Sequence, residues 1–144
     1  MASVSVSIDL ASDPQTTWDT LADTTRWEEW LSIHQKWKGE VPTALKVGTQ
    51  FTEVVSVMGM ANKIEWTIDE LDVPKRLKMS GTGMAGVVVE LSLEVQAKDE
   101  GSTAIIGASF TGAMIVGPIG KAVAKNAQAD LEASLAKFAE LVAV

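Results

Sequence analysis

Alternation of apolar and polar residues along this chain of 144 residues predicts an antiparallel β-sheet. From Val89 to Gln96 each valine or leucine is followed by a glutamate, serine or glutamine, which is typical of a half-buried strand. Short loops such as Asp99–Ser102 require antiparallel neighbours, because parallel strands need a long crossover. About seven strands are predicted, at Ser3–Leu10, Gln35–Val41, Thr49–Met58, Lys63–Asp69, Arg76–Ser80, Val87–Gln96 and Thr103–Phe110.

Helical signals appear in two places. Asp13 followed by Pro14 is typical of a helix start, so a helix is expected through Trp18 and Leu21, and a second short helix is expected at Arg26–Leu31. In the long helix predicted at Pro118–Leu141, one arc is apolar: Val123, Ala127, Leu131, Leu135, Phe138 and Val142.

That apolar arc must be buried, and the face of the sheet is the large apolar surface available to it. The predicted order is β-α-α-β6-α, an α+β helix-grip fold in which a curved antiparallel sheet grips the C-terminal helix. No linker or composition shift divides the sequence, so one domain over residues 1–144 is expected.

Charge and composition narrow the function classes. The net charge of −7 argues against general nucleic-acid binding, which needs a basic face. The absence of cysteine excludes disulfides and thiolate chemistry. The first residues lack the pattern of a signal peptide, and the apolar stretch at 114–124 is too interrupted for membrane insertion, so a cytoplasmic protein is expected.

Residues suited to catalysis are few. His34 is the single histidine, with no obvious partner; it is expected to be a loop residue bonded to backbone, or alternatively a polar group at a pocket rim. Gly81, Gly83 and Gly86 have the spacing of a nucleotide-binding loop, but a strand is predicted after them, so a glycine-rich turn is favoured. No ligand spacing for a metal is present, and no cofactor is predicted.

Large flexible side chains indicate an internal pocket. Five tryptophans occur without tyrosine, and a strongly curved sheet with one helix often leaves its interior incompletely filled. Along the edge of the long helix, Asn126, Asp130 and Ser134 recur every fourth residue, either as a solvated flank or as polar groups against the cavity. The predicted ligand-binding residues are Trp37, Met58, Trp66, Met79, Met84, Leu91, Phe110, Met114, Asn126 and Asp130, with His34 and Asp130 as weak catalytic candidates or polar anchors.

The whole pattern resembles a known superfamily. The Asp13-Pro14 start, the tryptophan-rich corner Arg26–Trp30 and the final helix are similar to START-like proteins, the SRPBCC or polyketide cyclase/dehydrase and lipid-transport superfamily. Three segments, at residues 30–37, 59–68 and 117–120, resemble an actinobacterial subfamily whose mycobacterial member is classed as the toxin of a type II toxin–antitoxin pair.

The resemblance implies three functions. The first is binding of a small, largely apolar ligand such as a lipid or aromatic polyketide, and the residues favour this over catalysis. The second is a toxin silenced by a small antitoxin-like partner, and the third is a cyclase or aromatase-like enzyme.

Overall fold

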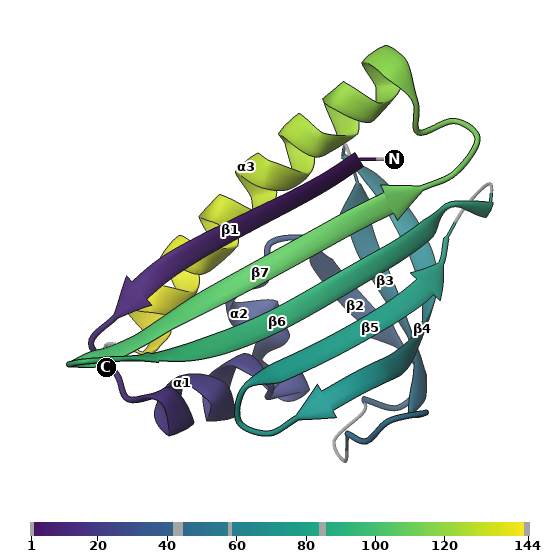
Figure 1. Ribbon diagram of the computed structural model, residues 1–144. Helices are drawn as coiled ribbons and strands as arrows, with labels where there is room; N and C mark the ends of the chain where they lie inside the picture. The colour runs from purple at the N-terminus through teal and green to yellow at the C-terminus, as the bar shows by residue number, and fades with distance from the viewer. Residues whose placement is uncertain (1, 42–44, 58, 84–85, 143–144) are drawn as a thin grey trace.

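The computed structural model describes residues 2–41, 45–57, 59–83 and 86–142. In these residues seven strands and two α-helical regions follow the predicted order (Figure 1). The elements are β1 (Ala2–Leu10), α1 (Pro14–Leu21), η1 (Thr24–Arg26), α2 (Trp27–Trp30), β2 (His34–Lys38), β3 (Gln50–Val57), β4 (Met60–Asp72), β5 (Arg76–Thr82), β6 (Val88–Lys98), β7 (Gly101–Thr111) and α3 (Gly117–Val142).

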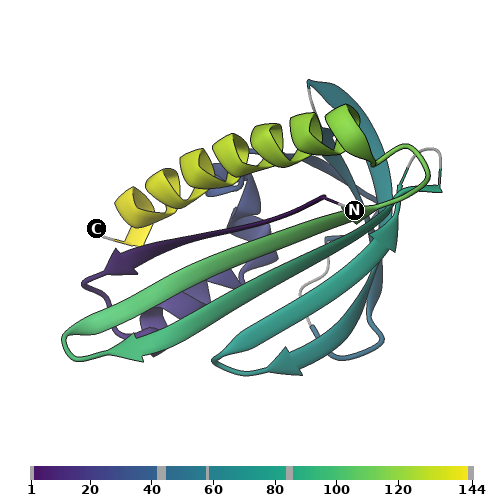
Figure 2. The ribbon, with the colours of Figure 1, turned by 45° about the horizontal axis from the view of Figure 1, so that its top comes forward.

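The sheet is antiparallel throughout, in the order β1-β7-β6-β5-β4-β3-β2. Strands β2 to β7 form a continuous meander, and β1 adds to the free edge of β7. Figures 1 and 2 show the sheet curving around one side of α3. The predicted helix-grip fold is therefore confirmed.

Strand β4 begins earlier than predicted. Val57 pairs with Met60, so the hairpin turns over fewer residues than the expected turn at 59–62. Gly59 has φ 79°, a conformation that glycine adopts without the steric cost of a Cβ. This tight turn leaves β4 free to pair along the whole of β3.

Helix α3 buries its apolar arc as predicted, with Leu131, Leu135 and Phe138 at most 2% exposed. It packs along the edge strand β1 and crosses the concave face of the sheet. No helix in the described part of the chain is long and apolar enough to cross a membrane.

The helical corner formed by α1, η1 and α2 closes the end of the concave face at which α3 ends (Figure 1). Trp27 and Trp30 are buried there, and the Trp30 ring meets Phe138 edge-on at 5.1 Å between centroids. Helix α1 begins after Asp13 as predicted, but the Asp13 side chain makes no capping hydrogen bond to it. Asp23 instead accepts a hydrogen bond from the Thr25 N–H at 3.0 Å.

Candidate functional site

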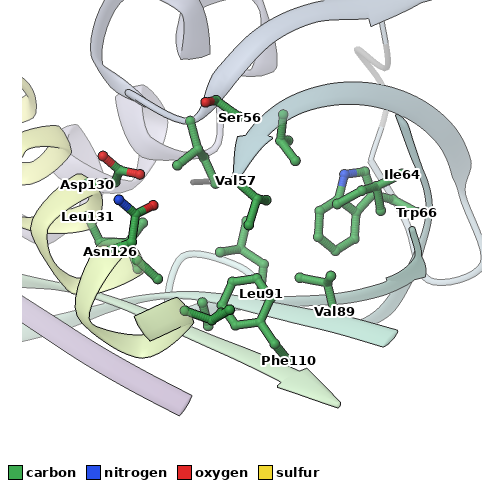
Figure 3. A pocket seen from close by; sticks show the side chains of 15 residues that line it. Ser56, Val57, Ile64, Trp66, Val89, Leu91, Phe110, Asn126, Asp130 and Leu131 are labelled. Atoms are coloured by element: carbon green, nitrogen blue, oxygen red, sulfur yellow. The ribbon is translucent and has the colours of Figure 1, made fainter. Parts of the chain in front are cut away.

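A pocket lies between the N-terminal half of α3 and the concave face of the sheet (Figure 3). Strands β3, β4, β6 and β7 supply most of its walls, and α3 supplies the side that faces them. The lining residues are Ile33, Val55, Ser56, Val57, Ile64, Trp66, Val89, Leu91, Ala108, Phe110, Val123, Asn126, Ala127, Asp130 and Leu131.

The walls are almost entirely apolar, and three lining side chains are polar. Ser56 comes from β3, whereas Asn126 and Asp130 come from consecutive turns of α3. Figure 3 shows these three at one side of the pocket, with Ile64 and Trp66 on the opposite side. The pocket therefore has a polar end and an apolar end.

The pocket has little free volume in this conformation. Its cavity volume is about 30 Å³, which is room for about two water molecules. A neighbouring cavity of about 80 Å³ is lined by some of the same side chains. The shared residues are Val57, Ile64, Val89, Phe110 and Val123. The two cavities therefore lie next to each other under α3 and share part of their walls.

Five of the predicted ligand-binding residues line this pocket: Trp66, Leu91, Phe110, Asn126 and Asp130. Whether they bind a ligand stays a prediction. Three others lie elsewhere. Trp37 packs against Trp27 and Phe51, Met79 is 1% exposed in the core, and Met114 is 57% exposed in the connection to α3. Met58 and Met84 lie outside the described residues.

The His34 side chain has a partner that the sequence pattern did not predict. His34 is the first residue of β2, and its Nδ1 is hydrogen bonded to Oε2 of Glu53 on the neighbouring strand β3. Because a carboxylate accepts, Nδ1 is the donor. The second oxygen of Glu53 accepts from the indole Nε1 of Trp66 at 2.9 Å. The expectation of a loop histidine bonded to backbone is therefore wrong.

This His34–Glu53–Trp66 network is buried, with 3% of the His34 side chain and 1% of the Glu53 side chain exposed. A buried carboxylate is tolerated when its oxygens accept hydrogen bonds, and here each oxygen has one donor. Neither His34 nor Glu53 lines the pocket, whereas Trp66 does. The network therefore fixes the orientation of Trp66, a wall of the pocket, through residues that lie outside the pocket.

Glu53 could have been found from the sequence. In β3 it lies between Phe51 and Val55 on the inward face of an alternating strand, and both neighbours are buried. A glutamate at a strand position where the alternating neighbours are apolar indicates a buried carboxylate with hydrogen-bond partners rather than a solvated one. The partner remained hidden because the pairing of β2 with β3 brings together residues 19 positions apart.

Among the described residues, no side chain or backbone group is hydrogen bonded to the Asp130 carboxylate. Burial raises the pKa of this carboxyl above the ordinary value, because the charged form loses contact with water. None of the ion pairs in the described chain includes it. The third member of the predicted polar stripe, Ser134, is fully buried and structural, since it accepts from the Ser32 N–H at 2.8 Å and donates to the Asp130 carbonyl at 2.8 Å.

The three glycines spaced like a nucleotide-binding loop lie at the end of β5 and after it. Gly81 lies within β5, Gly83 and Gly86 lie between β5 and β6, and strand β6 follows them where a nucleotide-binding loop would lead into a helix, which excludes that loop. Gly81 is needed for packing, because a Cβ there would lie 2.5 Å from the Glu65 carbonyl oxygen. Within the described ranges, no group of three carboxylate or histidine side chains could hold a metal ion.

Comparisons with known proteins agree with this architecture. The family model described as "Polyketide cyclase / dehydrase and lipid transport" matches residues 1–143. A START superfamily protein from Mycobacterium smegmatis, of solved structure, is similar with a TM-score of 0.76 at 13% identity, over 99% of this chain and 97% of that one. The chain therefore belongs to the polyketide cyclase/dehydrase and lipid transport family.

Relatives in Mycobacterium tuberculosis are similar over nearly their whole length. Toxin Rv0910 is 38% identical over 143 residues, which is 99% of both chains. Uncharacterized protein Rv1546 is 37% identical over 141 residues, which is 98% of this chain and 99% of that protein. The predicted likeness to a mycobacterial protein classed as a toxin is thus confirmed.

Proposed function

We propose that this protein binds a small, largely apolar molecule, of lipid or aromatic polyketide type, in the pocket between the sheet and α3. The observation that carries the proposal is the composition of the walls, which are apolar except at one end. The family description, which includes lipid transport, supports the same class of ligand.

The energetics allow useful affinity without further contacts. Burying ~200 Å² of apolar ligand surface contributes about 5 kcal/mol before ordering costs. Because the cavity volume is small, binding requires the side chains that line both cavities to move apart. Phe110 is the largest of them, and its rotation would join the two spaces.

A fluorescence titration with N-phenyl-1-naphthylamine, a neutral apolar dye, tests the proposal. The wild-type protein should enhance the dye emission in a saturable way. Ala127→Leu fills the pocket from α3 and should weaken dye binding at least about tenfold, the effect of removing roughly 1.4 kcal/mol. Ala129→Leu is the matched control, because Ala129 lies exposed on the far face of the same helix.

Absence of saturable binding by the wild-type protein would overturn the proposal. Equal binding by Ala127→Leu and Ala129→Leu would do the same, because it would place the dye outside the pocket. Far-ultraviolet circular dichroism of both variants verifies that each is folded.

A second candidate function rests on the relative named as a toxin, at 38% identity over 99% of this chain. In that case the protein arrests growth and a small partner protein neutralises it. Induced expression in a host related to its own should then stop growth, and co-expression of a small adjacent reading frame should restore it. Harmless expression would contradict this function. Toxicity that persists in Ala127→Leu would show that it does not depend on the pocket.

A further inference from the structure

Asp130 gives the pocket a charge that its other walls lack. Among the described residues that line the pocket it is the one ionisable side chain. It lies at the polar end with Ser56 and Asn126, opposite the apolar end formed by Ile64 and Trp66 (Figure 3). A molecule that fills the pocket therefore places one of its ends beside a carboxylate.

The surroundings of Asp130 differ from those of the other carboxylate described above. Both oxygens of Glu53 accept a hydrogen bond, so that its charge is compensated inside the protein. Asp130 is half-buried and raised in pKa by desolvation, and it forms no ion pair in the described chain. The lysines of α3 at 121, 125 and 137 are exposed. A partly desolvated carboxylate without a counter-charge is stabilised by a cation that enters the pocket.

The net charge of the whole chain also favours a cationic ligand. At −7 it attracts organic cations and repels anions over the distance of a Debye length. A fatty acid would bring a second carboxylate next to Asp130, where like charges repel. An alcohol would gain a hydrogen bond without the charge assistance that an ammonium group supplies.

We propose that the pocket selects an amphiphilic amine, a molecule with an apolar body and a protonated amino group that binds Asp130. This rests on the proposed function and names the ligand class for the same site. The apolar body occupies the end at Ile64 and Trp66, and the ammonium group donates to the Asp130 carboxylate.

A matched series of three ligands separates charge from shape: 2-(1-naphthyl)ethylamine, 2-(1-naphthyl)ethanol and 1-naphthaleneacetate. Displacement of N-phenyl-1-naphthylamine at pH 7.5 measures their affinities. The amine should bind about tenfold more tightly than the alcohol, the usual advantage of a charge-assisted hydrogen bond. The acetate should bind most weakly.

Asp130→Asn keeps the size of the side chain and removes its charge, so it should abolish the advantage of the amine while retaining binding of the alcohol. Glu132→Gln is the control, because it removes one charge from the exposed face of α3 and should leave the ranking unchanged. Lowering the pH through the raised pKa of Asp130 should also reduce the preference of the wild-type protein, while the ligand amine stays protonated.

The outcomes distinguish the two proposals. Equal affinities of amine and alcohol for the wild-type protein, or an amine preference that survives in Asp130→Asn, would overturn the amine proposal and leave the apolar pocket intact. Failure of the dye and of all three ligands to bind would overturn the proposed function itself. If Asp130→Asn does not fold, a pH-independent amine preference of the wild-type protein is the overturning result.

Discussion

Replacing Glu53 with alanine removes the acceptor for two buried donors, the His34 Nδ1–H and the Trp66 Nε1–H. The Glu53 side chain is 1% exposed, so water does not reach either donor without local opening. Each buried donor left without an acceptor costs about 1–3 kcal/mol, so the two together give an expected loss of roughly 2–6 kcal/mol in the free energy of unfolding.

Glu53→Gln should cost less, about 1–2 kcal/mol, because the amide oxygen still accepts from Trp66 and the bond to His34 is lost. Glu65→Ala is the control, since Glu65 is exposed on the neighbouring strand β4, and it should change the stability by no more than about 0.5 kcal/mol. Urea unfolding at pH 7, followed by tryptophan fluorescence and circular dichroism, measures all three. A loss in Glu53→Ala no larger than in Glu65→Ala would refute the assignment of the network as a buried support of the pocket wall.

Three further predictions concern the pocket and α3. Phe110→Ala should join the two cavities and lower the free energy of unfolding by roughly 3–5 kcal/mol. It should also allow bulkier naphthyl alcohols to displace the dye. If the largest alcohol that displaces the dye is the same as for the wild-type protein, Phe110 does not limit the size of the pocket. Ser134→Ala removes the acceptor for the Ser32 N–H and should cost about 1–3 kcal/mol in urea unfolding, whereas no loss would show that this bond is not needed. Burial raises the pKa of Asp130 in the folded state, so its charged form destabilises the fold as the pH rises through that pKa. Asp130→Asn should therefore be more stable than the wild-type protein at pH 7 but not at pH 3. A stability difference between the two proteins that does not change with pH would contradict this.

The fold could be predicted from the sequence where one periodicity extends over a whole element. Val89, Leu91, Leu93 and Val95 alternate without interruption, and all four are buried. The apolar arc of α3 is equally regular, and its burial follows from the same reasoning. The antiparallel order of the strands could then be predicted from the short loops, because short loops allow few other connections between strands.

The site could be predicted only in part, because its geometry depends on which strands meet. Phe110 and Asp130 line the pocket from separate elements, as their inward phases suggested. Met79 was predicted to bind a ligand but lies in the filled core. The alternation along a strand shows which side chains point inward, and it does not show whether they border a cavity. Met114 follows β7 in a connection without periodicity, and its exposure could not be read from local pattern.

The indole N–H groups provide the most direct test of the pocket. The structure describes all five tryptophans, and Trp66 is the one that lines the pocket. In ¹⁵N-labelled protein titrated with 2-(1-naphthyl)ethanol, the Trp66 Nε1–H resonance should shift in a saturable way. The resonance of Trp18, which is buried in α1 and does not line the pocket, should stay in place. A Trp66 resonance that does not move while the ligand binds would contradict the claim that the apolar molecule enters between the sheet and α3.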